Sequence, residues 1–198
     1  MKTQIFKGQK LTRTKIKNNI LSIYAQCSEE DKIDWYGDAL AYAENIAFNE
    51  QPESVNIACG VIAALSPVKS WKDNKKIALD MLKTGDCGHM KQFKNKARRI
   101  IASTGSEDEI MDILNGNKIC AFFQNILHPD NCKFVTIDRH ALSVALGRRV
   151  KEEEMTGITK NQYEFFLQSY VWAAQSVGIN PTLLQSATWV RYRKLKKY

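Results

Sequence analysis

The amino-acid sequence predicts an all-α protein. Apolar residues recur every three or four positions along most of the 198-residue chain, which is the spacing of amphipathic helices. Capping residues and helix breakers separate these stretches. Only the tetrad Phe134–Ile137 has the composition of a strand. The expected architecture is therefore a set of packed helices without a substantial sheet.

Four helices are expected in the first 85 residues. Ser28–Asp31 has the form of a capping box, which opens a helix by satisfying its first backbone N–H groups. Pro52 suits the first turn of a helix, whereas Ser66-Pro67 ends one because proline cannot continue the hydrogen-bond ladder. The expected ranges are 16–24, 28–47, 52–65 and 70–85.

The middle of the chain predicts two short helices joined by a tight turn. A helix over 91–104, closed by Gly105, precedes them. Residues 107–127 then have the pattern of a helical hairpin. Its parts are a helix that ends at Leu114, the turn Asn115–Asn117 and a helix over 118–127.

In the last third, Asp138 stands between the strand-like tetrad and an expected helix over 139–146. An aspartate in that place is typically an N-cap, because its carboxylate accepts hydrogen bonds from the first backbone N–H groups of the helix. Further helices are expected to begin at Thr159 and at Pro181.

The net charge of +8 arises from 29 Lys and Arg against 21 Asp and Glu. Three segments are basic: 1–28, which has no carboxylate, 91–99 and 191–197. Such segments favour a phosphate backbone as the partner, because neutralising phosphates releases condensed counterions. The alternative is that these lysines are simply solvated.

Composition and missing motifs exclude several classes. With 44% hydrophobic and 25% charged residues, the chain is neither fibrous nor disordered. No stretch reaches the ~18 apolar residues that a membrane span needs, and no signal sequence is expected. The five cysteines have no C-x-x-C spacing, which suits free thiols in a reducing cytoplasm. Phosphate-binding, dinucleotide-binding, zincin and hydrolase motifs are absent. His128, Cys132 and His140 lack a fourth ligand, so we expect neither a metal nor a cofactor.

Four sequence blocks together carry a resemblance to a known family. They are Ile62–Pro67 followed by Trp71 and Asn74, Phe93–Ile101, Leu114–Ala121, and Val135–His140. In this order and spacing they resemble the helix-hairpin-helix DNA glycosylase superfamily, of which endonuclease III is the familiar member. The match covers about residues 57–150.

A phage-associated branch of such proteins is more similar still. The patterns L-S-P-x-x-x-W-x-x-N, V-T-I-D-R-H-A and L-Q-x-x-x-W-V-x-x-R resemble the α-glutamyl/putrescinyl-thymine pyrophosphorylase-like proteins. Members of that branch are linked to hypermodified thymine or to glycosylase action on modified bases. The resemblance thus implies DNA-base chemistry in the cytoplasm of a bacterial or phage-infected cell.

The resemblance implies a two-lobed, all-α helix-hairpin-helix fold with an active site in the interlobe cleft. One lobe is expected over 48–137, with the hairpin at 107–127, and the other over 1–47 plus 138–198. The partner implied is double-stranded DNA with modified bases. Asp138 matches the catalytic aspartate of the family, and Lys118 lies where some members carry a Schiff-base lysine.

The remaining candidates for contact with DNA or an extruded base come from the same blocks and the basic segments. Each has an ordinary alternative as a core aromatic, a helix-surface residue or a solvated lysine. They are Gly116, Asn117, Gln124, Asn125, Arg139, His140, Ser66, Lys69, Trp71, Asn74, Lys94, Lys96, Arg98, Arg99, Gln185 and Trp189.

The sequence also departs from the family pattern. The turn Asn115–Asn117 lacks the proline and second glycine of the family hairpin, and Val68 or Lys69 stands where the family has a glutamine. No cysteine follows Cys132, so no iron–sulfur cluster is expected. The leading hypothesis is a DNA glycosylase. The alternatives are a transferase that displaces pyrophosphate from an activated 5-hydroxymethyluracil in DNA, and a non-enzymatic helix-hairpin-helix module that binds DNA.

Overall fold

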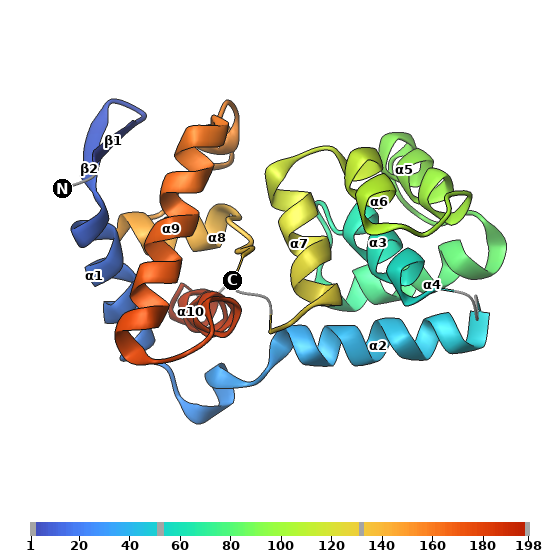
Figure 1. The fold of residues 1–198 in the computed structure, drawn as a ribbon, viewed down its shortest axis with the longest axis horizontal. Coiled ribbons are helices and arrows are strands. Elements are labelled where there is room, and N and C mark those ends of the chain that lie inside the picture. Colours follow the sequence, from blue (N-terminus) through green and yellow to red (C-terminus); the bar gives the residue numbers. More distant parts are fainter. Residues whose placement is uncertain (1–2, 51–53, 131–132, 197–198) are drawn as a thin grey trace. The chain divides into compact units, whose positions relative to one another are not determined.

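The computed structural model describes residues 3–50, 54–130 and 133–196, and these residues are mostly α-helical, with one small two-stranded sheet (Figure 1). The chain divides into two compact units. Unit 1 combines residues 1–36 with 130–198, and unit 2 comprises 37–129. These boundaries lie near the start of one long helix and in the loop after the helical hairpin, whereas the expected lobes were divided at 47/48 and 137/138.

Unit 1 is built around the packing of its first helix against its last three (Figure 1). Ile16 and Ile20 of that first helix are fully buried, as are Phe166 and Tyr170. The elements are β1 (Thr3–Phe6), β2 (Gln9–Thr12), α1 (Arg13–Tyr24), the 3-10 turn η1 (Glu29–Lys32), α8 (Arg139–Leu146), the 3-10 turn η2 (Glu152–Met155), α9 (Lys160–Val177) and α10 (Pro181–Leu195).

The β1–β2 hairpin was not expected from the sequence. Its strands are antiparallel, with Thr3 opposite Thr12 and Phe6 opposite Gln9. Lys7 and Gly8 form the turn with φ of 45° and 78°, a left-handed pair that matches the twist of a two-residue hairpin. Phe6 is buried edge-to-face against Phe166, with ring centroids 5.5 Å apart. The contact between Phe6 and Phe166 thus anchors the β1–β2 hairpin to unit 1. Each strand has only four residues, which is too short to be predicted from the sequence.

Unit 2 surrounds one apolar helix. Ala58–Leu65 of this helix is buried on every side, and four other helices pack against it. This helix has 11 residues, and no helix in the described part of the chain is long and apolar enough to cross a membrane. The elements are α2 (Trp35–Glu50, whose first two residues belong to unit 1), α3 (Val55–Leu65), α4 (Trp71–Thr84), α5 (Lys91–Ile101), α6 (Glu107–Leu114) and α7 (Asn117–Leu127).

Several expected helix ends need correction. The capping box at Ser28–Asp31 opens only η1, and α2 begins later, at Trp35. The N-cap of α3 is Ser54, while Pro52 lies outside the described residues. The tetrad Phe134–Ile137 pairs with no described strand. These differences arise because a local signal marks a possible helix start or strand without showing which tertiary contacts will extend it.

Gly105 gives a test of the packing in unit 2. Its φ is +77°, and an added Cβ would lie 3.0 Å from the Oγ of Ser54, the N-cap of α3. We predict that Gly105→Ala lowers the free energy of unfolding by about 1–2 kcal/mol through backbone strain. Loss of the Ser54 cap adds about 0.5–2 kcal/mol. Thermal unfolding followed by circular dichroism measures the change.

The matched control is Gly85→Ala, because Gly85 has nearly the same φ, +72°, but nothing within 4 Å of the added Cβ. Gly85→Ala should therefore lower the free energy of unfolding only through backbone strain. If both variants unfold at the same temperature, the packing of Gly105 against Ser54 contributes nothing.

Candidate active site around Asp138

Asp138 caps the N-terminus of α8 in unit 1. Its Oδ1 accepts a hydrogen bond from the backbone N–H of Ala141 at 2.7 Å, and its Oδ2 accepts one from Nε1 of Trp189 at 2.8 Å. The side chain is half-buried, and within the described residues it forms no ion pair with Lys or Arg. The positive end of the helix dipole and two neutral donors therefore hold a carboxylate whose charge no cation neutralises.

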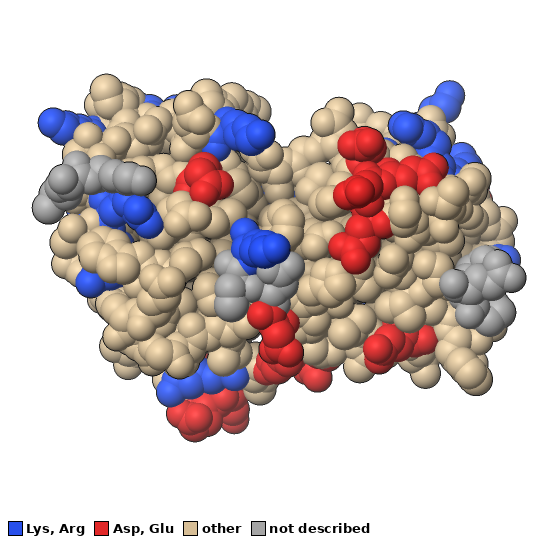
Figure 2. All heavy atoms as spheres, viewed as in Figure 1, with Lys and Arg blue, Asp and Glu red and all other residues tan. Residues whose placement is uncertain are grey.

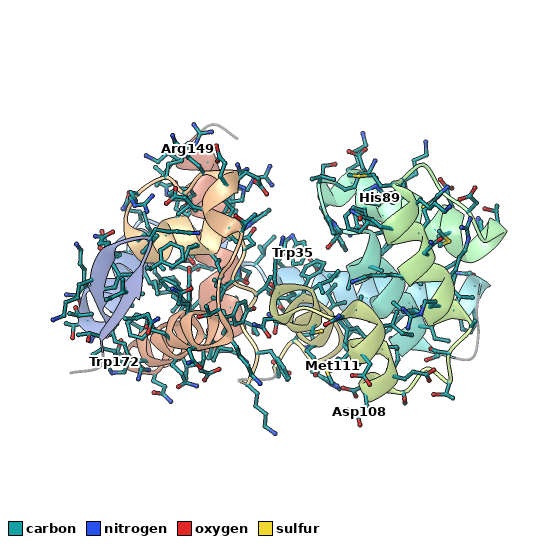
Figure 3. All side chains as sticks on the ribbon, turned by 90° about the horizontal axis from the view of Figure 1, so that it is seen from above. Trp35, His89, Asp108, Met111, Arg149 and Trp172 are labelled. Carbon is teal, nitrogen blue, oxygen red and sulfur yellow. The ribbon has the colours of Figure 1, made fainter. Side chains whose placement is uncertain are left out.

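Aromatic rings surround this carboxylate. The ring of Trp189, which donates to Asp138, lies edge-to-face with His140 at 5.8 Å and 6.5 Å from Trp35, which Figure 3 labels. The guanidinium of Arg193 lies 4.7 Å from the centre of the Trp189 ring. The site thus combines one anion with flat apolar surfaces.

The surroundings of His140 favour its neutral form. Burial lowers its pKa below the ordinary value, and the charges of Arg139 and Arg193 lower it further, while Asp138 acts in the opposite direction. Arg139 itself lies 3.4 Å from the exposed carboxylate of Glu152. The lowered pKa therefore favours an uncharged imidazole ring next in sequence but one to the aspartate.

Two tyrosines of α9 fix the backbone on either side of Asp138. The hydroxyl of Tyr163 donates to the carbonyl of Val135 at 2.8 Å and accepts from the N–H of Ile137 at 3.2 Å. The hydroxyl of Tyr170 donates to the carbonyl of Ala141 at 2.8 Å. Residues seven apart share one face of a helix, so a single face of α9 holds the segments before and after the aspartate.

These tyrosines were missed by the sequence analysis. Tyr170 is fully buried, and burial together with the charge of Asp138 raises the pKa of its phenol, which stays protonated and able to donate. The sequence signal that could have revealed them is the pair of tyrosines on the apolar face of α9, because a buried phenol needs a hydrogen-bond partner. The partners themselves come from a distant part of the chain.

The predicted helical hairpin is present in unit 2. Asn115 ends α6 with φ of 45°, and Gly116, with φ of 156°, precedes the first residue of α7, Asn117. Lys118 is the second residue of α7 and is exposed. Nζ of Lys96 donates to the carbonyl of Leu114, so a lysine closes the end of α6.

The basic cluster of α5 is largely engaged within unit 2. Nζ of Lys94 and the guanidinium of Arg98 pair with Asp86 at 2.8 and 3.0 Å, and these partners lower the pKa of its carboxyl group. Nζ of Lys96 is bound to the carbonyl of Leu114. Of the four expected phosphate contacts, only Arg99 is exposed without an ion-pair partner among the described residues.

Four of the candidate amide side chains are buried, so in this conformation they do not reach a base, whereas Asn117 is exposed at the start of α7. Gln124 donates from Nε2 to Glu107 at 2.8 Å, and Asn74 donates to the carbonyl of Ile62 at 3.1 Å. Asn125 has no exposed surface. Gln185 accepts from the hydroxyl of Tyr36 at 2.8 Å. The four buried residues shape the interior.

The loop between α3 and α4 presents an exposed apolar residue. Val68 is 76% exposed and has φ of +55°, a strained conformation for a β-branched residue. Ser66 caps α3, and Nζ of Lys69 donates to the carbonyl of Gly88 at 3.3 Å. Trp71 lies edge-to-face with Tyr42 at 6.2 Å, and the neighbouring loop carries His89, which Figure 3 labels.

One family comparison covers both units. The chain belongs to a family described as "Family of unknown function (DUF7178)", whose model matches residues 2–196. No curated protein and no solved structure matches the sequence. The chemistry of the Asp138 site therefore has to be argued from its residues.

We predict that the tyrosines of α9 hold Asp138 in its hydrogen bonds. Tyr163→Phe and Tyr170→Phe each remove one hydroxyl and should let the indole N–H of Trp189 exchange with solvent at least about tenfold faster, because local opening is easier. Hydrogen exchange measured by NMR follows this indole directly.

Ser169→Ala is the matched control. It removes a fully buried hydroxyl from the same helix, but that hydroxyl bonds only to Phe165 within α9. Each of the three variants loses about 1 kcal/mol of stability. Equal indole exchange in all three would show that the tyrosines have no particular effect on Asp138.

Proposed function

We propose that this protein is a DNA glycosylase that cleaves the N-glycosidic bond of a modified or damaged base after flipping its nucleotide. The observation that carries the proposal is the Asp138 carboxylate, fixed at the N-terminus of α8 by Trp189 and Ala141 and not neutralised by a cation. The resemblance of the Val135–His140 block to the family motif supports the same role.

The chemistry needs a fixed anion. When the bond between C1′ and the base nitrogen breaks, its electron pair leaves with the base, and positive charge develops on the sugar. A carboxylate that is already oriented stabilises this charge without reorganising at the moment of reaction. Water then adds to C1′ and loses a proton, which leaves an abasic site and a free base.

The rings around Asp138 suit an extruded base. Trp189, His140 and Trp35 provide flat surfaces, and flipped bases are commonly bound by stacking on such side chains. A neutral His140 adds no positive charge that would oppose the developing cation. In unit 2, the exposed Val68, the adjacent Lys69 and the hairpin at Asn115–Asn117 are the proposed contacts with the duplex.

Lys118 is proposed to contact phosphate. An amine becomes an effective nucleophile at neutral pH when it is desolvated or lies beside another cation. Lys118 is exposed on α7, so its amine is not desolvated. The proposal is thus a glycosylase without Schiff-base chemistry.

A transferase acting on activated thymine is the second candidate. It is favoured by the L-Q-x-x-x-W-V-x-x-R pattern, because Trp189 of this pattern donates to Asp138 and Arg193 lies against the Trp189 ring. An arginine there could hold the pyrophosphate that leaves. Mass spectrometry of modified phage DNA after incubation separates the candidates: free base indicates the glycosylase, and a decorated thymine indicates the transferase.

We predict that Asp138→Asn reduces turnover by at least about 100-fold, because groups of this kind contribute two or more decades to the rate. Folding and DNA binding should change little, since asparagine is also a good N-cap. Single-turnover release of free base and thermal unfolding check both parts.

The matched control is Asp108→Asn, which makes the same change at an exposed residue of α6 (labelled in Figure 3). It should retain full activity. A turnover of Asp138→Asn within about tenfold of the parent would exclude Asp138 as the catalytic group.

We predict that Lys118→Ala weakens DNA binding by about tenfold, or about 1.4 kcal/mol, and leaves single-turnover chemistry at saturation unchanged. Borohydride should trap neither protein on DNA, because no imine forms. Efficient trapping of the parent that is lost in Lys118→Ala would instead identify Lys118 as a nucleophile.

A further inference from the structure

The net charge of the protein resides in unit 1. Residues 1–36 and 130–198 contain 18 Lys and Arg against 10 Asp and Glu, whereas residues 37–129 contain 11 of each. Unit 2 is therefore neutral although it contains the helical hairpin and the basic α5. Figure 2 shows acidic side chains gathered over the part of unit 2 that holds α6. Those residues of α6 are Glu107, Asp108, Glu109 and Asp112.

The first elements of unit 1 are basic and contain no carboxylate of their own. Residues 1–28 contain no Asp or Glu, and their described part forms the β1–β2 hairpin and α1 (Figure 1). We name the surface of these elements the N-terminal basic face. It is defined by Lys7, Lys10, Arg13, Lys15 and Lys17.

Neutral partners hold three of these cations. Nζ of Lys7 donates to the carbonyl of Thr156 at 2.9 Å, and the guanidinium of Arg13 donates to the carbonyl of Gln168 at 2.6 Å. Nζ of Lys17 lies 4.3 Å from the centre of the Trp172 ring, which Figure 3 labels. Carbonyls and an aromatic ring orient a cation without cancelling its charge, unlike the Asp86 carboxylate that neutralises Lys94 and Arg98.

The other two lysines extend the face. Lys10 is exposed and lies opposite the exposed Ile5 in the hairpin register. Lys15 is exposed on α1, on the flank away from Lys17, because two residues along a helix turn the side chain by about 200°. Between these flanks lie the uncharged Asn18 and Ser22, so phosphates meet no repulsion across the helix.

We propose that the N-terminal basic face binds the phosphate backbone of duplex DNA and supplies most of the sequence-independent affinity of the protein. The choice of DNA among polyanions rests on the proposed function. Oriented cations lose little freedom on binding, which lowers the cost of association. Each phosphate neutralised releases counterions and gives a measurable salt dependence.

The test compares DNA binding by two triple variants of the full chain. Lys10→Gln, Lys15→Gln and Lys17→Gln together change the N-terminal basic face. The matched control changes three exposed lysines of unit 2, Lys72, Lys76 and Lys91, to Gln. Affinity for unmodified duplex DNA is measured by fluorescence anisotropy over a series of NaCl concentrations.

The triple variant of the N-terminal basic face should lose at least about tenfold in affinity. The magnitude of the slope of log affinity against log salt should fall by about 2 to 3, because each lost phosphate contact contributes about 0.9. The control should stay within about twofold of the parent. Lys10→Gln with Lys15→Gln leaves the Lys17–Trp172 contact intact and should lower the slope by about 2. This double variant keeps the test valid if the triple variant is unstable.

Two outcomes overturn the proposal: an unchanged slope in the double variant, or an equal loss in the unit 2 control. A loss seen only with RNA or with vesicles of anionic lipid overturns the choice of duplex DNA. Because the assay uses unmodified DNA and involves no chemistry, its result is independent of base release. Binding that behaves as expected here, together with no release of free base from modified DNA, would contradict the glycosylase proposal and leave the docking surface supported.

Discussion

The position of the Asp138 carboxylate depends on the need to satisfy buried backbone groups in a segment that belongs to no sheet. Residues 134–137 form neither a helix nor a paired strand, and Val135 and Ile137 are buried, so their carbonyl and N–H groups cannot turn to water. The hydroxyl of Tyr163 donates to the carbonyl of Val135 and accepts from the N–H of Ile137. The packing of α9 therefore sets where α8 begins, and with it the place of its capping aspartate.

The partner of each cation decides whether it remains available to an anionic ligand. Lys94 and Arg98 look like phosphate contacts in the sequence but share one carboxylate, that of Asp86. Arg13 and Lys17 also have partners, but these are a carbonyl and an indole ring. Counting lysines along the chain cannot separate these cases, because Asp86 and Trp172 come from other elements.

Helices and their caps could be predicted because their signals are local. Asp138 before α8 and the glycines after α4 and α8 were placed correctly, since a cap needs only its own first or last turn. The β1–β2 hairpin was missed because it depends on Phe6 packing against Phe166. The interior positions of Gln124 and Asn74 were likewise missed, since their partners, Glu107 and Ile62, lie 17 and 12 residues away.

In the proposed function, the positive and the negative charges of unit 1 have different tasks. The N-terminal basic face carries cations held by neutral groups, which suits the uniform charge of a DNA backbone. Asp138 is held by neutral groups as well, the indole of Trp189 and the amide of Ala141, so its negative charge stays available for a developing cation. A direct ion pair would cancel that charge before any substrate arrived. Neutral partners orient both kinds of group, acceptors and a ring for the cations and donors for the carboxylate, and leave their charge for the ligand.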